Sequence, residues 1–201
     1  MTSSIHPLDE ALALTSSAPG QFTGQTHPGY WNMVGPFGGV TAATLLQAVM
    51  LHPDRLGDPL SLTVNYAGAL TAGFYTVQAT PVRTNRSTQH WTLTILQADA
   101  EGAPVVTTTA TAVTAVRRDT WSAGDVPMPA VPGPTAHPAI EHGPEAMEWL
   151  NRYEMRPITG ALPRAWDGSG DHSLTQLWMR DAPARPLDFC ALSALADLFF
   201  P

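Results

Sequence analysis

The chain has 201 residues, of which 44% are hydrophobic and 13% charged, so it can bury a core in one large domain or two small ones. All ten basic residues are arginines, and the absence of lysine excludes both a Schiff-base lysine and a phosphate-loop lysine. The net charge is -7 and the arginines form no cluster beyond Arg117-Arg118, which argues against nucleic-acid binding.

The single cysteine, Cys190, excludes an internal disulfide and favours a reducing compartment. Its apolar neighbours indicate a core thiol rather than a nucleophile. The first residues lack the basic and apolar regions of a signal peptide, and no apolar run approaches the roughly 20 residues of a membrane span. We therefore expect a cytoplasmic protein without a membrane span.

The first half begins with a predicted helical turn at residues 9–14 and short strands at 21–26 and 30–34. Gly35-Pro36 breaks this pattern and Gly38-Gly39 leads into residues 40–51, which are apolar on almost every face and stop at Pro53. A helix without a polar face predicts that other structure surrounds it.

Four longer strands are expected next because apolar and polar residues alternate there. They cover residues 61–66, 75–79, 91–97 and 105–116, with a hairpin turn at 99–102. Short strands, one buried helix and four antiparallel strands fit the hotdog arrangement, in which a curved antiparallel sheet wraps around a central helix. The first 121 residues are therefore predicted to form one α+β hotdog.

Residues 122–145 contain six prolines and predict a stiff linker. The pattern then restarts, with strands expected at 150–158 and 174–180 and an apolar helix at 186–200. A complete second hotdog would need roughly 60 to 70 further residues for its long strands. Residues 146–201 are therefore expected to form the N-terminal part of a second hotdog, which makes the chain an incomplete double hotdog.

Two features carry candidate chemistry. Free N–H groups at a helix that begins with Gly38-Gly39 could hold a thioester carbonyl oxygen, although a helix start packed against a strand would have the same sequence. Asp197 lies in an otherwise apolar predicted helix, where burial would raise its pKa and suit it to deprotonate water. A solvent-facing aspartate at a helix end is the alternative.

The segment Gly35-Pro36-Phe37-Gly38-Gly39, with the helix after it and strand 59–66, resembles the first half of acyl-CoA thioesterases of the thioesterase II type. Residues 176–180 and 194–201 are similar to that family's second hotdog, up to the end of its helix. The resemblance implies a double hotdog that hydrolyses fatty acyl-CoA without metal or cofactor, often as a homo-oligomer.

By the same resemblance, Asp197 is the catalytic aspartate, and Phe37, Gly38 and Gly39 bind the substrate. The family completes its site with a Thr or Ser and a Gln on strands that follow this helix, and the sequence has no residues there. A truncated, inactive or weak form is the resulting hypothesis.

Two other functions stay open. One is a non-catalytic acyl-CoA-binding or assembly module, which the missing strands favour. The other is a hotdog enoyl-CoA hydratase, which needs an Asp and a His early in the helix, whereas residues 40–51 contain no acid and His52 follows at the far end.

The histidines show no metal-ligand spacing, so no metal is expected. Residues 167–171 predict a hairpin turn rather than a cation loop, and Arg83 and Arg86 are either coenzyme A phosphate ligands or solvated turn residues.

Overall fold

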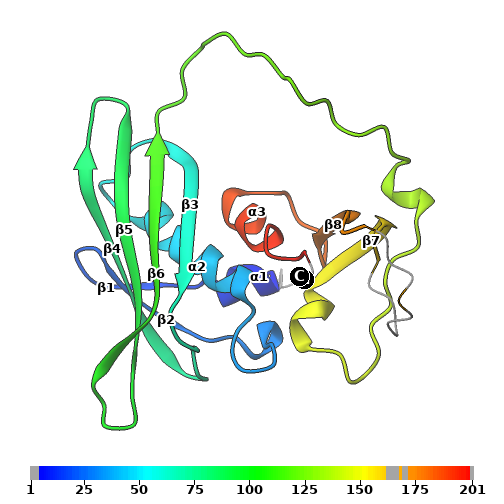
Figure 1. Ribbon diagram of the computed structural model, residues 1–201. Coiled ribbons are helices and arrows are strands. Elements are labelled where there is room, and N and C mark those ends of the chain that lie inside the picture. The colour runs from blue at the N-terminus through cyan, green and yellow to red at the C-terminus, as the bar shows by residue number, and fades with distance from the viewer. Residues whose placement is uncertain (1–4, 162–167, 169–171, 200–201) are drawn as a thin grey trace.

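The computed structural model describes residues 5–161, 168 and 172–199, which form two unequal units joined by a long loop (Figure 1). In order, the elements are α1 (Pro7–Ala11), β1 (Thr15–Ala18), β2 (Gln21–Gln25), η1 (Pro28–Tyr30), α2 (Gly38–Leu51), β3 (Asp58–Tyr66), β4 (Phe74–Thr84), β5 (Thr88–Ala98), β6 (Pro104–Ala115), η2 (Pro134–Ala136), η3 (Glu148–Arg152), β7 (Tyr153–Thr159), β8 (Gln176–Asp181) and α3 (Phe189–Leu195).

The first unit is a six-stranded antiparallel sheet in the order β1-β2-β4-β5-β6-β3, so β3 is an edge strand. Alternation along β5 places Trp91, Leu93 and Ile95 in the core, each at most 2% exposed. Strands with this period bury one face, and α2 lies against it. The four longer predicted strands are confirmed, and each extends beyond its predicted start.

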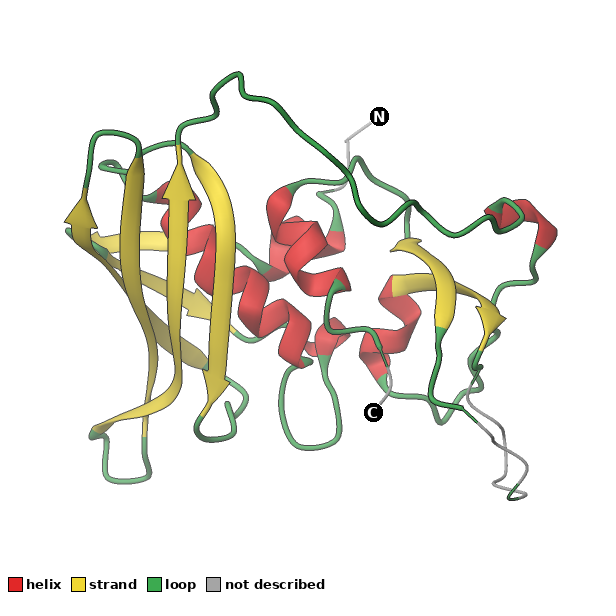
Figure 2. Cartoon of the chain, turned by 45° about the horizontal axis from the view of Figure 1, so that its top comes forward, coloured by secondary structure: helices red, strands yellow, loops and turns green. Residues whose placement is uncertain are grey.

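Helix α2 is enclosed as expected, with ten of its fourteen residues buried. The sheet covers one side of α2 and α3 packs against another, so the two helices form the middle layer between the sheets (Figure 2). The helix begins at Gly38, two residues before the predicted start, and the residue before it, Phe37, makes no side-chain cap hydrogen bond.

The second unit repeats the plan of a helix against an antiparallel sheet, with β7 paired to β8 and α3 beside them. The described residues of this unit contribute only these two strands to the sheet. The chain is therefore an α+β double hotdog whose second hotdog is incomplete in this chain, as the sequence predicts.

Helix α3 is shorter than the predicted 186–200. The Asp188 carboxylate accepts a hydrogen bond from Ala191 N–H at 2.8 Å and fixes the start of the helix. After Leu195 the chain tightens into a turn in which the Asp197 and Leu198 N–H groups donate to carbonyls three residues back. The prediction that Asp197 lies within a helix is therefore wrong: it lies in the turn after it.

Two other expectations are wrong, and one strand was not predicted. Residues 30–34 are not a strand: Tyr30 ends the 3-10 turn η1, which the His27 side chain caps, and Asn32 N–H donates to the Gly35 carbonyl in a tight turn. The strand expected from residue 150 begins at Tyr153, after η3, and strand β1 had no predicted counterpart. The turn predicted at 167–171 lies, apart from residue 168, outside the described residues.

The loop after β6 has no helix or strand over residues 116–133, all of which the structure describes, and residues 116–130 are exposed throughout. From Pro132 onward the chain forms hydrogen bonds with the second unit. Trp178 Nε1 donates to the Pro132 carbonyl at 2.9 Å, and Ile140 N–H donates to the Met155 carbonyl at 2.8 Å. No helix among the described residues is long and apolar enough to cross a membrane.

Candidate active site

The start of α2 is fixed against the second unit by an aromatic stack. The ring of Phe37, the residue just before α2, is 3% exposed and lies parallel to the Trp149 indole, with ring centroids 4.3 Å apart. Tyr153 meets the Phe37 ring edge-on at 5.9 Å. Such pairs add about 0.5–1.5 kcal/mol beyond area burial. Phe37 therefore helps to hold the two units together, and its contact with a substrate stays a prediction.

Gly39 allows the two central helices to touch through their backbones. A Cβ atom at this position would lie 2.4 Å from the Ala194 carbonyl oxygen and 2.4 Å from the Phe37 ring. Backbone atoms of a packed helix cannot move aside cheaply, so only glycine fits here. This packing brings the end of α3 to the N-terminus of α2.

Asp197 occupies that junction. The position of a Cβ at Gly38 would be 2.6 Å from Asp197 Oδ2, and the Asp197 carboxylate accepts a hydrogen bond from Gly39 N–H. Partial burial raises the pKa of the Asp197 carboxyl, and the Gly39 hydrogen bond opposes that rise. The carboxylate thus caps α2 from another element, while the residue itself remains exposed enough to meet water.

Tyr66, the last residue of edge strand β3, reaches the same point from the first unit. Its hydroxyl donates to the Gly38 carbonyl at 2.8 Å and lies 3.2 Å from the position of a Gly38 Cβ. Burial of the hydroxyl and the negative charge of Asp197 raise the pKa of Tyr66 to about 12. Nothing in the sequence singles Tyr66 out, because it continues the alternation of its strand.

Tyr66 also lines an open groove of about 420 Å³. One wall is the segment from Asn32 to Pro36, and the other is the chain from Tyr66 to Leu70 after β3. The groove and a small inner pocket share Pro36, Thr41 and Leu70 in their walls. An elongated ligand that lies in the groove could therefore extend into the inner pocket, between α2 and the sheet.

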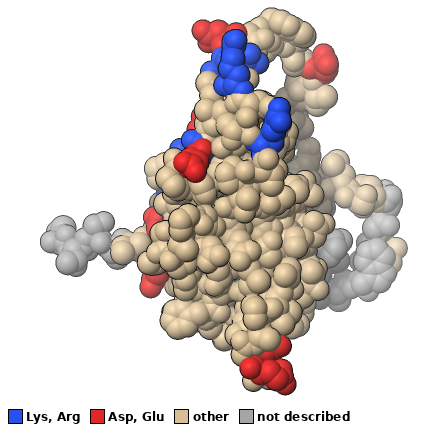
Figure 3. Space-filling view, turned by 90° about the vertical axis from the view of Figure 1, so that its left-hand side faces the viewer, with Lys and Arg blue, Asp and Glu red and all other residues tan. Residues whose placement is uncertain are grey.

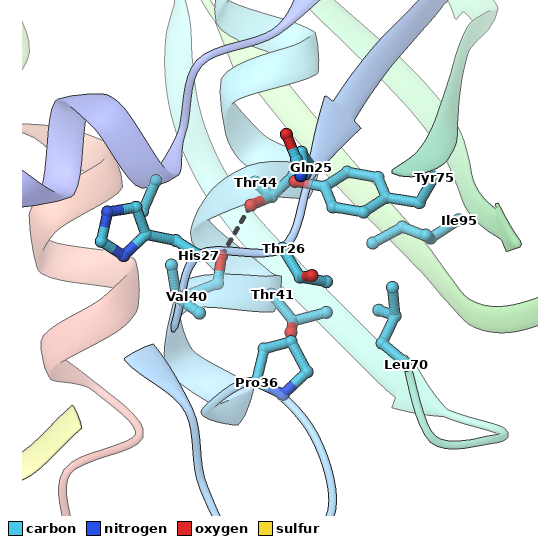
Figure 4. Close-up of a pocket in the computed structure, with 11 residues that line it drawn as sticks. Gln25, Thr26, His27, Pro36, Val40, Thr41, Thr44, Leu70, Tyr75 and Ile95 are labelled. Atoms are coloured by element: carbon cyan, nitrogen blue, oxygen red, sulfur yellow. Dashed lines mark hydrogen bonds between the residues drawn. The ribbon is translucent and has the colours of Figure 1, made fainter. Parts of the chain in front are cut away.

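The inner pocket is drawn in Figure 4, where Thr41, Thr44 and Tyr75 point toward its centre from α2 and β4. Its volume of about 20 Å³ is little more than one water molecule. Thr44 Oγ1 donates to the Val40 carbonyl at 2.8 Å and hydrogen-bonds the Tyr75 hydroxyl. Because these polar groups already have hydrogen-bond partners, the pocket suits the apolar end of a ligand.

The structure thus brings Gly38, Gly39 and Asp197 together, although the sequence separates them by more than 150 residues. It does not bring His52 to this point, because His52 follows the other end of α2, about 20 Å away at 1.5 Å per residue. Arg83 and Arg86 lie near the β4–β5 hairpin, which contacts Asp54 just beyond that far end. No group of three or more acidic, His or Cys side chains that could hold a metal occurs among the described residues.

Two family models match the chain: an acyl-CoA thioesterase N-terminal domain over residues 27–115 and an acyl-CoA thioesterase C-terminal domain over residues 124–201. No curated protein matches the chain significantly.

Among solved structures, a hot dog fold protein of unknown function from Alicyclobacillus acidocaldarius is 47% identical, with a TM-score of 0.85 over 98% of this chain and 70% of that one. The acyl-CoA thioesterase II TesB2 of Mycobacterium marinum is 20% identical, with a TM-score of 0.69 over 95% of this chain and 68% of its own. The TesB protein of Mycobacterium avium subsp. paratuberculosis is 18% identical, with a TM-score of 0.67 over 96% and 68% of the two chains.

The last two likenesses support the fold alone, whereas the family models and the 47% identical relative cover both units. The N-terminal and C-terminal domain models match in the order in which the two hotdogs occur along this chain. The chain belongs to the acyl-CoA thioesterase family of double-hotdog proteins, and by that resemblance it is an acyl-CoA thioester hydrolase.

Proposed function

We propose that the protein hydrolyses a fatty acyl-CoA to the free acid and coenzyme A by means of a water molecule activated by Asp197. The observation that carries this proposal is the position of the Asp197 carboxylate at the N-terminus of α2, with its pKa raised by burial. A carboxyl group with a raised pKa is a better base than an ordinary aspartate.

In the proposed reaction, Asp197 accepts a proton from water as the water oxygen bonds to the thioester carbon. The tetrahedral intermediate then collapses, the carbon–sulfur bond breaks, and the departing thiolate takes the proton back from Asp197. The products are a carboxylic acid and a free thiol. The groove beside Tyr66 would hold the acyl chain, with its methyl end toward the inner pocket.

The positive end of α2 would polarise the thioester carbonyl. Because the Gly39 N–H already donates to Asp197, the Gly38 N–H is the donor of the pair that we assign to the carbonyl oxygen. Gly39 then acts on the base and Gly38 on the substrate. Both residues therefore keep a role at the site, and the role of Phe37 is to hold the helix end in place.

A second candidate is a non-catalytic acyl-CoA-binding or assembly module. The observation that favours it is the hydrogen bond from Gly39 to Asp197, because an aspartate that only caps a helix needs no chemistry. The enoyl-CoA hydratase alternative loses support, since the distance from His52 to the start of α2 prevents an Asp–His pair there.

Asp197→Asn and Asp197→Ala separate the two candidates. Asparagine keeps an oxygen that can accept from Gly39 but cannot take a proton, whereas alanine loses both. A catalytic base predicts that thiol release from acyl-CoAs falls at least about a hundredfold in both variants. Retention of full turnover by Asp197→Asn would show that the residue is only a cap. Binding of acyl-CoA without any turnover by the native chain would favour the binding module.

We also propose that the protein is a cytoplasmic homo-oligomer. Most of the side of the molecule formed by the sheet carries no charge, and arginines gather at one end of it (Figure 3). A cross-strand row of exposed threonines, Thr80, Thr92 and Thr111, runs over β4, β5 and β6. If copies associate through this face, Thr92→Arg will shift the mass measured by light scattering toward the monomer, whereas Thr92→Ser will not.

The buried free thiol of Cys190 fits a reducing compartment.

A further inference from the structure

We infer that the Tyr66 hydroxyl orients the attacking water together with Asp197. Tyr66 would then be a positioning residue contributed by the first hotdog to a base in the second. The inference rests on the proposed role of Asp197, and it concerns a residue that neither the sequence pattern nor the likeness to thioesterases identifies.

The Asp197 carboxylate and the Tyr66 hydroxyl face one another across Gly38. The point where a Cβ of Gly38 would stand lies 2.6 Å from Asp197 Oδ2 and 3.2 Å from the Tyr66 hydroxyl oxygen. The two oxygens are therefore separated by at most about two hydrogen-bond lengths, the spacing that one water molecule bridges. Gly38 has no side chain to fill the space that the two oxygens face.

The Tyr66 hydroxyl has a fixed hydrogen-bond direction. A tyrosine hydroxyl has one hydrogen and two lone pairs, and the Tyr66 hydrogen is committed to the Gly38 carbonyl at 2.8 Å. The oxygen can then only accept from a further partner. A water between the two residues would donate one hydrogen to Asp197 and the other to Tyr66, which leaves a lone pair of the water oxygen to attack.

Tyr66 is also accessible from the groove. Tyr66 ends the edge strand β3, is 52% exposed and lines the open groove. A thioester in the groove can approach the water from the side that neither oxygen occupies. Tyr66 thus connects the proposed substrate groove with the proposed base, since it lines the groove and also lies beside Gly38 on its Asp197 side.

A purely structural role is the rival explanation, because the same hydroxyl also steadies the Gly38 carbonyl. Tyr66→Phe removes the hydroxyl and keeps the ring, and Tyr30→Phe is the matched control. Tyr30 is 1% exposed, and its hydroxyl lies buried away from the groove without a hydrogen-bond partner among the described residues.

If Tyr66 orients the water, Tyr66→Phe will lower kcat for acyl-CoA hydrolysis about tenfold to a hundredfold while KM changes less than about twofold. The thermal midpoint will stay close to that of Tyr30→Phe, which keeps full kcat. Unchanged kcat in Tyr66→Phe, with an inactive Asp197→Asn, overturns the role of Tyr66 and leaves the proposed function standing. Full activity of Asp197→Asn overturns the proposed function itself.

A second measurement does not depend on turnover. A high-resolution crystal structure of the native chain should show one ordered water within hydrogen-bond distance of both Asp197 Oδ2 and the Tyr66 hydroxyl, and the Tyr66→Phe crystal should lack it. A native site in which no water bridges the two oxygens overturns the inference, whatever the kinetics.

Discussion

The backbone N–H of Gly39 donates to the carboxylate of Asp197, so a helix of one hotdog is capped by an acid of the other. The two residues are brought together by the packing of α2 on α3, where the missing side chain of Gly39 lets the Ala194 carbonyl approach. One contact therefore couples the docking of the two units to the position of the proposed base.

The activity should depend on pH through Asp197. Burial raises the pKa of this carboxyl above the usual 3.8, and the proposed mechanism needs the ionised form. Activity is then low where the carboxyl is protonated and increases as the pH rises through the raised pKa. We expect the acid limb of a plot of kcat/KM against pH to have its midpoint above 3.8. A limb at or below the ordinary aspartate value would contradict the environment described for Asp197.

The two neighbouring glycines should respond differently to alanine. Gly39→Ala places a methyl group 2.4 Å from a backbone carbonyl and should lower the free energy of unfolding by about 1–3 kcal/mol. Gly38→Ala meets the Asp197 carboxylate and the Tyr66 hydroxyl, which can shift, so it should reduce turnover much more than stability. Urea unfolding and a thiol-release assay on both variants check the contrast. Equal losses of stability would show that Gly38 is a packing position as well.

The aromatic stack should contribute strongly to stability. Trp149 is 7% exposed and stacked on Phe37, so Trp149→Ala should lower the free energy of unfolding by about 3–5 kcal/mol. Trp121, in the loop after β6, is 85% exposed and provides the control: Trp121→Ala should change stability by less than about 0.5 kcal/mol. Denaturant titrations of both variants are sufficient. A small effect at Trp149 would mean that the units dock mainly through the helices.

Cys190 should be inert while the protein is folded. Burial raises the pKa of its thiol to about 12, and its Sγ donates to Gln47 Oε1 at 3.3 Å. At pH 8 only about one thiol in ten thousand is then ionised, and the thiolate is the reactive form. Iodoacetamide should label the native chain far more slowly than the urea-unfolded chain, and Cys190→Ala should keep its thioesterase activity. Rapid labelling of the native chain would place the thiol at the surface.

Much of the fold can be predicted from the sequence because periodicity reports burial directly. The alternation around Trp91 and the apolar run before Pro53 both correspond to elements of the structure. The predicted elements differ from the structure where short-range hydrogen bonds determine the backbone conformation. The side chain of His27 caps a 3-10 turn that ends at Tyr30, where a strand is expected to begin, and the caps at Asp188 and Ala196 shorten the last helix.

The site was predicted less completely. Asp197 and the two glycines were identified through a family likeness, but the residue that faces them from β3 was not. Tyr66 is set apart only by where its strand ends relative to Gly38, and that relation exists in three dimensions alone. The use of Gly39 as a cap donor was likewise hidden, since a hydrogen bond between units leaves no local pattern.

The long exposed loop after β6 has a practical consequence. Residues 116–130 are exposed at every position, while the contact between the units runs through α2, α3 and the Phe37–Trp149 stack. We therefore expect the two units to stay together when the peptide chain is cut in this loop. Two separately produced fragments, divided within the loop, would be expected to reassemble by themselves, and the chain could then serve as a split reporter whose signal is thiol release.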